Sequence, residues 1–129
     1  MNYYCGTDII EVERVKKALL YTPGFKEKVF TPLEISYAEQ KSDITRFLHY
    51  AGRFAAKEAI YKSLSKIDNN VFLNQIEIIN DSHNKNRPVV NILKPDLNTL
   101  QKENKLIIDV SISHVKEYAT ANAISTLTT

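Results

Sequence analysis

The chain has 129 residues, which is enough for a single domain over residues 1–129 but too few for two domains. Its 43% hydrophobic and 25% charged residues argue against disorder, and no run of about 18 apolar residues is present that could span a membrane. The net charge of +2 is too small to indicate a nucleic-acid binder, and a lone cysteine, Cys5, with no signal-peptide pattern before it, predicts a cytoplasmic protein.

The first half of the chain predicts one strand followed by helices. Residues 3–10 are rich in aromatic and β-branched types and predict a strand, and the apolar spacing of residues 11–20 predicts a helix. Pro23-Gly24 then breaks the chain, and residues 31–34 (TPLE) supply an N-cap, a proline at the first helical position and the glutamate of a capping box. Residues 44–64 carry an apolar stripe at helical spacing and predict a rod about 30 Å long.

The second half predicts two hairpins separated by a helix. Residues 76–79 and 89–93 form the first hairpin, residues 95–103 a helix, and residues 106–113 and 118–124 the second hairpin. The order of elements indicates the α+β class, with a small antiparallel sheet packed against one long helix.

Positive charge is concentrated in one stretch near the N-terminus. Between residues 14 and 28 five basic side chains stand against one acid, a local charge of +4, so the rest of the chain carries about −2. The basic residues are Arg14, Lys16, Lys17, Lys26 and Lys28. This asymmetry predicts a basic face for an acidic partner; the alternative is an ordinary solvated helix surface.

Asp8 lies at the end of the first predicted strand, after Gly6 and before the apolar pair Ile9-Ile10. Such neighbours partly bury the carboxylate, and a buried carboxylate must be paired, hydrogen-bonded or bound to a metal. From the local sequence alone Asp8 is either a metal ligand or a cap or turn residue.

The long helix carries several charges at four-residue spacing. Arg53 and Lys57 form a like-charge pair, continued by Tyr61, and such a row is easier to explain if an anion lies beside it. This favours a phosphate-rich ligand over a solvated face. Glu58 and Lys62 have the favourable order of a helical ion pair, so Glu58 also has a purely structural explanation.

The segment 110–114 (VSISH) ends in a histidine that leaves a strand. Alternation places Ser111 and Ser113 on one face of the strand and His114 on the other. Alone, such a histidine is more often structural than catalytic. Zinc-ligand spacing and nucleotide-binding loops are absent, and three glycines are too few for a glycine-rich phosphate loop.

Taken together, these segments resemble the holo-acyl-carrier-protein synthases. The similarity covers nearly the whole chain in the same order and is carried by residues 6–15 (GTDIIEVERV), 30–34 (FTPLE), 52–59 (GRFAAKEA) and 110–114 (VSISH) with Tyr118-Ala119.

The resemblance implies a Mg²⁺-dependent 4′-phosphopantetheinyl transferase of fatty acid biosynthesis, built as a homotrimer with sites between neighbouring protomers. A serine of acyl carrier protein would attack the β-phosphate of coenzyme A, and adenosine 3′,5′-bisphosphate would leave. The catalytic residues implied are Asp8, Glu58 and Lys62, with Asp8 and Glu58 as the magnesium ligands. The general base stays open between Glu58, a metal-bound water and, less favoured, Glu34.

The same resemblance assigns the remaining contacts. The residues implied to bind coenzyme A are Arg53, Lys57, Lys62, Ser113 and His114. Those implied to dock the acidic carrier protein are Arg14, Lys17, Lys26 and Lys28.

The chain departs from the family in its turns. Tyr4 stands where the family usually has glycine, and residues 63–70 replace a glycine-containing turn after Lys62, which weakens the predicted backbone cradle for the adenosine phosphates. Residues 84–88 (NKNRP) replace the usual Gly-Lys-Pro. A non-catalytic relative that only binds an acidic protein is the alternative function, and a small nucleic-acid binder is a third, less favoured one.

Overall fold

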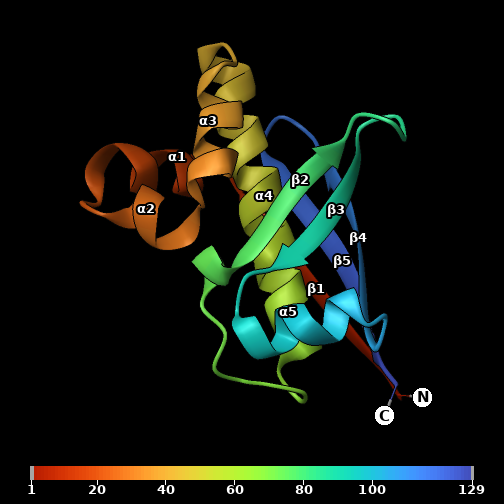
Figure 1. The fold of residues 1–129 in the computed structure, drawn as a ribbon. Helices are drawn as coiled ribbons and strands as arrows, with labels where there is room; N and C mark the ends of the chain where they lie inside the picture. The colour runs from red at the N-terminus through yellow and green to blue at the C-terminus, as the bar shows by residue number, and fades with distance from the viewer. Residues whose placement is uncertain (1, 129) are drawn as a thin grey trace.

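The computed structural model describes residues 2–128. The elements are β1 (Asn2–Glu11), α1 (Val12–Tyr21), α2 (Phe25–Val29), α3 (Pro32–Glu39), α4 (Asp43–Leu64), the 3₁₀ turn η1 (Leu73–Gln75), β2 (Ile76–Asp81), β3 (Arg87–Ile92), α5 (Pro95–Lys102), β4 (Leu106–His114) and β5 (Tyr118–Leu127). The predicted α+β class and the long helix are confirmed (Figure 1). Within residues 2–128, no helix combines the length and apolar character needed to cross a membrane.

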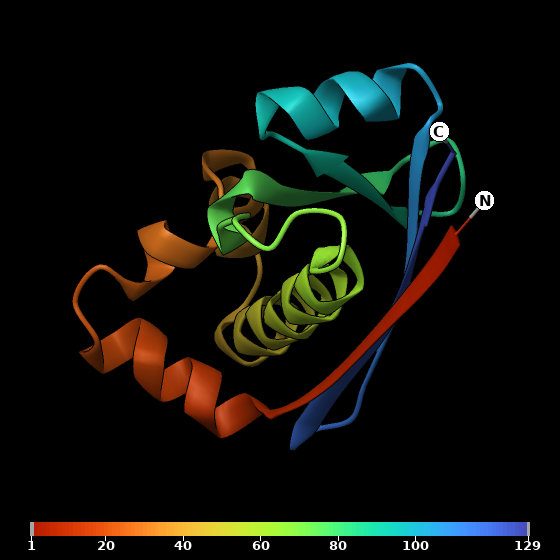
Figure 2. The same cartoon turned by 90° about the horizontal axis from the view of Figure 1, so that it is seen from below.

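The strands form two antiparallel sheets rather than the single sheet predicted. One has the order β1-β5-β4, and the other is the β2-β3 hairpin. Figure 2 looks almost along α4 and shows the three-stranded sheet on one side of this helix, the hairpin on another, and α1 to α3 on the remaining side. Both sheets therefore bury their inner faces on α4.

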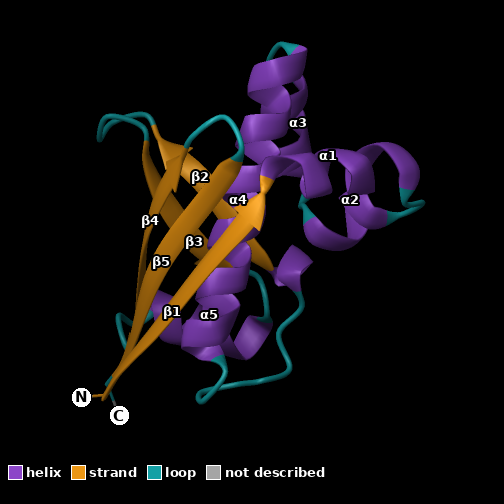
Figure 3. Ribbon diagram, turned by 180° about the vertical axis from the view of Figure 1, so that it is seen from behind, coloured by secondary structure: helices purple, strands orange, loops and turns teal. Residues whose placement is uncertain are grey.

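The outer face of the three-stranded sheet has no helix over it, as the view from behind shows (Figure 3). The pairing register places alternate side chains of the three strands on this face. Its exposed large hydrophobic side chains are Tyr3, Ile9, Ile107, Tyr118 and Ile124. A monomer thus leaves a partly apolar sheet surface in water.

Strand β1 lies directly against α4 because its contact residue has no side chain. A Cβ atom added to Gly6 would lie 1.9 Å from the carbonyl oxygen of Ala59, a backbone atom that cannot move aside. Asp8, two residues further along the strand, points to the same side as Gly6 and so toward α4. The close approach at Gly6 therefore determines where Asp8 lies.

Replacing Gly6 by alanine is expected to lower the free energy of unfolding by about 3 kcal/mol or more, because the added methyl group has no space. Gly52→Ala is the matched control, since its Cβ would lie 3.3 Å from the Cγ2 methyl group of Ile112 and the change should cost about 1 kcal/mol or less. Denaturant unfolding of both variants measures the difference. Equal stabilities would show that β1 does not depend on this contact.

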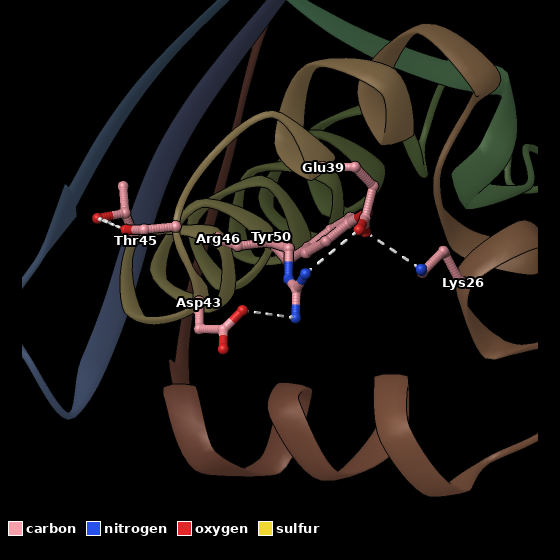
Figure 4. A network of polar contacts seen from close by, with 7 residues as sticks. Lys26, Glu39, Asp43, Thr45, Arg46 and Tyr50 are labelled. Atoms are coloured by element: carbon pink, nitrogen blue, oxygen red, sulfur yellow. Dashed lines mark hydrogen bonds and ion pairs between the residues drawn. The ribbon is translucent and has the colours of Figure 1, made fainter.

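A polar cluster around Glu39 fixes α2 and α3 to α4 (Figure 4). The Glu39 carboxylate accepts hydrogen bonds from the Tyr50 hydroxyl at 2.5 Å and from Lys26 Nζ at 3.1 Å, and it pairs with Arg46 at 3.4 Å. The Tyr50 hydrogen bond, together with Lys26 and Arg46, lowers the pKa of Glu39 although burial opposes this. The cluster therefore stabilises the fold at neutral pH, and its contribution is lost as the pH falls through that lowered pKa.

Candidate active site

Two carboxylates and one ammonium meet where β1 crosses α4. Lys62 Nζ lies 3.3 Å from Asp8 Oδ1 and donates a hydrogen bond to the carbonyl oxygen of Thr7 at 2.9 Å. Partial burial raises the pKa of Glu58, and the negative charge of Asp8 raises it further, while Lys62 opposes the shift. The structure thus brings Asp8 close to Glu58 and Lys62, which lie far from it in the sequence.

The donor set at this position fits a hard divalent cation. A carboxylate whose ionisation is disfavoured by a neighbouring carboxylate is stabilised when a cation lies between the two groups. Mg²⁺ is commonly held by one or two carboxylates, with waters and substrate phosphates in the other positions. No group of three or more acidic, histidine or cysteine side chains gathers among residues 2–128.

Lys57 does not face this site, and the predicted phosphate contact of Lys57 disagrees with the structure. Its side chain is fully buried and its ammonium lies 2.5 Å from Glu34 Oε1. The same ammonium donates to the carbonyl oxygens of Leu73 at 3.0 Å and Ile76 at 2.5 Å. With all three donors used inside the protein, Lys57 has none left for a ligand.

Glu34 is equally committed to the core. Its Oε1 accepts the Thr31 backbone N–H at 2.8 Å, completing the predicted capping box, and its Oε2 accepts the Ile78 N–H at 2.8 Å. A side chain that is 3% exposed and holds these bonds cannot reach a substrate, so Glu34 is removed from the candidate bases. The row of cations on α4 predicted a nearby anion, and that anion is the carboxylate of Glu34.

Arg53 lies on another side of α4, at the wall of a cavity of about 300 Å³. Its guanidinium donates a hydrogen bond to Asn80 Oδ1 on β2 and is 7% exposed. His114, at the end of β4, lines the same cavity with Lys41 and His49. The predicted ligand residues Arg53 and His114 are thus brought together.

Ser113 is separated from His114 within one protomer. Its register with Thr120, which in turn pairs with Ile9, places Ser113 on the outer face of the three-stranded sheet. Ser113 therefore does not line the cavity that contains His114, as strand alternation requires. Within one protomer the implied shared role of these two residues is not supported.

Arg53 and Glu58 point in different directions from α4. Five positions along a helix correspond to a rotation of about 140° away from the starting direction. Arg53 faces the β2-β3 hairpin, whereas the Glu58 carboxylate is close enough to Asp8 on β1 for their charges to interact. One small ligand cannot contact both residues inside a single protomer.

The predicted docking residues differ in how free their charges are. Arg14, Lys17 and Lys28 are exposed, and within residues 2–128 they form no ion pair. Lys26 is paired with Glu39, so its charge is compensated. The basic face therefore consists mainly of Arg14, Lys17 and Lys28.

The turn after α4 is held by side chains instead of glycines. Asp68 accepts the Asn70 N–H at 2.9 Å and pairs with Lys94 Nζ at 2.5 Å, and Lys94 also donates to the Asn70 carbonyl oxygen at 3.1 Å. Among the described non-glycine residues, left-handed backbone occurs elsewhere, at Lys85 and Asn86 in the β2-β3 turn and at Asn104 after α5. The turn within residues 63–70 therefore forms without the left-handed backbone conformations that its asparagine and aspartate residues could have adopted.

Sequence reasoning missed most of the cavity around Arg53. Lys41 and His49 lie before Arg53 in the chain, and Asn80 and Asn86 lie between the two strands that were predicted for the first hairpin. Only the packing of the hairpin against α4 brings them together, and no local pattern indicates it.

Comparison with known proteins identifies the family of this chain. A family model described as the 4′-phosphopantetheinyl transferase superfamily matches residues 4–123. A holo-acyl-carrier-protein synthase of Fusobacterium nucleatum is 40% identical over 119 residues, covering 92% of this chain and 94% of that protein.

Solved structures agree with the fold. The ACPS-CoA complex of Chronobacterium ammoniagenes has a TM-score of 0.81 at 27% identity and covers 100% of both chains. A holo-acyl-carrier-protein synthase of Bacillus anthracis in complex with CoA (3′,5′-ADP) has a TM-score of 0.74 at 29% identity, covering 97% of this chain and 96% of that one. The resemblance read from the sequence is confirmed, and the chain belongs to the 4′-phosphopantetheinyl transferase superfamily.

Proposed function

We propose that the chain is a holo-acyl-carrier-protein synthase that transfers 4′-phosphopantetheine from coenzyme A to a serine of apo acyl carrier protein. The observation that carries this proposal is the meeting of Asp8, Glu58 and Lys62 where β1 crosses α4, in a chain of this superfamily. Adenosine 3′,5′-bisphosphate is the second product. The reaction belongs to fatty acid biosynthesis, and we place it in the cytoplasm.

Asp8 and Glu58 are the residues that would hold Mg²⁺. When bound there, the ion would neutralise charge on the pyrophosphate of coenzyme A. Lys62 holds Asp8 in place, and its half-exposed ammonium can also contact the departing phosphate group. Among the side chains considered as general base, Glu58 is retained because Glu34 is sealed in the core.

We also propose that the active enzyme is a homotrimer whose sites lie between protomers. The exposed apolar face of the three-stranded sheet supports this, because oligomerisation would remove it from water. The opposed directions of Arg53 and Glu58 support it as well, since the cavity of one protomer can then complete the carboxylate site of its neighbour. Light scattering coupled to size exclusion tests the assembly: a monomeric active enzyme would contradict it.

Incubation with apo carrier protein, coenzyme A and Mg²⁺ tests the function. A mass gain of one phosphopantetheine group on the carrier, abolished by a chelator and restored by added Mg²⁺, is the expected result. A carrier that binds but gains no mass would instead support the non-catalytic module.

Docking of the carrier is tested at Arg14. Arg14→Glu is expected to raise the KM for the carrier about tenfold and leave the KM for coenzyme A within about twofold, because an exposed charge at an interface rim mainly steers the charged partner. Lys102→Glu, exposed at the end of α5 and remote from α1 in Figure 1, is the matched charge reversal. Equal effects of both variants, or equal rises in both KM values, would contradict a docking role.

A further inference from the structure

The cavity beside Arg53 is lined by a second histidine, His49, in addition to His114. The lining combines the cations Lys41 and Arg53 with His114 and the carboxamides of Asn80 and Asn86, and it includes no acidic residue. A cavity of about 300 Å³ with this lining suits a phosphate group attached to an organic body.

The ring of His49 is fixed against an aromatic neighbour but its nitrogens are free. The centroids of the His49 and Tyr37 rings are 4.9 Å apart, and Lys41 Nζ lies 4.6 Å from the centroid of Tyr37. Neither nitrogen of His49 hydrogen-bonds to any residue from 2 to 128, and this part of the chain contains no sealed side-chain nitrogen without a partner. The ring nitrogens of His49 therefore remain accessible from the cavity that the ring lines.

His49 is an uncharged imidazole at physiological pH. Burial lowers its pKa to about 3, and the positive charges of Arg53, Lys41 and His114 contribute to the shift. Of the groups that face it, Lys41 follows α3, Arg53 belongs to α4 and His114 ends β4, so basic side chains approach from three elements. A neutral imidazole presents one N–H donor and one acceptor without adding to this repulsion.

We propose that His49 is a selectivity residue that donates a hydrogen bond to the 3′-phosphate of coenzyme A. This rests on the proposed function. Coenzyme A carries phosphate in two separated places, a pyrophosphate and a 3′-phosphate. In the proposed trimer, when the pyrophosphate lies at Asp8 and Glu58 of one protomer, the acid-free cationic cavity of the neighbouring protomer is available to the second group. The selectivity is for coenzyme A over 3′-dephospho-coenzyme A.

Variants at His49 test this with both substrates. His49→Phe keeps an aromatic ring beside Tyr37 but has no donor, whereas His49→Gln and His49→Asn keep an N–H. The ratio of kcat/KM for coenzyme A to that for dephospho-coenzyme A is expected to fall at least about tenfold in His49→Phe, the size of one lost hydrogen bond to a charged group. At least one of the two amide variants should keep the ratio within about threefold of the wild type. Thermal melting confirms folding, and His49→Leu replaces His49→Phe if the latter unfolds.

An unchanged ratio in His49→Phe, an equal loss with both substrates, or a wild type that does not discriminate would each overturn the proposal. Calorimetry with adenosine 3′,5′-bisphosphate and adenosine 5′-monophosphate measures the same difference without turnover. If the wild type transfers nothing, the proposed function fails, and the binding ratios alone decide on His49. Between pH 6 and 8, the pH dependence of binding should be the same in wild type and His49→Gln, because His49 does not titrate there.

Discussion

Asp8→Asn and Glu58→Gln are each expected to lower kcat for phosphopantetheine transfer by at least about 100-fold without lowering the melting temperature. Each change removes one anionic oxygen donor from a pair that would hold a catalytic cation, and losses of this size follow even from removing groups that only support such ligands. Stability should be kept or raised, because the Asp8 charge disfavours ionisation of its neighbour Glu58 in the free protein. Transfer is measured by the mass of the carrier at saturating substrates, with a melting curve for each variant.

Glu103→Gln is the matched control, since Glu103 is an exposed carboxylate at the end of α5 with only a surface contact to Lys105 at 3.6 Å. Its kcat should stay within about twofold of the wild type. Near-normal turnover of Asp8→Asn would reject the metal assignment. A loss of activity that accompanies unfolding would show that the carboxylate pair is structural.

Elements with a local signal could be predicted from the sequence, whereas their assembly could not. The helix that starts at Thr31 was predicted from its capping box, and the hairpins from turn residues between β-rich runs. α2 was missed because five residues are too few for an apolar period, and the division into two sheets depends on packing around α4 rather than on any one strand.

A site residue could be predicted where its neighbours in the sequence indicate its chemistry. Asp8 was singled out by its glycine and apolar neighbours, and Gly6 is the residue that sets it against α4. Lys57 was misjudged because like charges four apart indicate a nearby anion but not its identity. That anion is Glu34, and its position depends on how α3 packs against α4. The residue pattern of α4 alone gives no information on that packing.

The Lys57–Glu34 pair predicts a large effect on stability. Lys57→Met is expected to lower the free energy of unfolding by about 3–5 kcal/mol, because it leaves the buried carboxylate of Glu34 without its counter-charge. The carbonyl oxygens of Leu73 and Ile76 lose their donor in the same variant. Lys66→Met, a change at an exposed lysine beyond the end of α4, should alter the free energy of unfolding by no more than about 0.5 kcal/mol.

The double variant Lys57→Met with Glu34→Gln separates the lost pairing from lost packing. If the cost of Lys57→Met is mainly an uncompensated buried charge, removing that charge should recover part of it, and the two single effects will not add. A coupling energy of about 1–3 kcal/mol from denaturant unfolding is the expected result. Additive single effects would mean that Lys57 stabilises the core through its carbonyl contacts and its stem. In that case the Glu34 carboxylate on α3 would not explain the row of cations on α4.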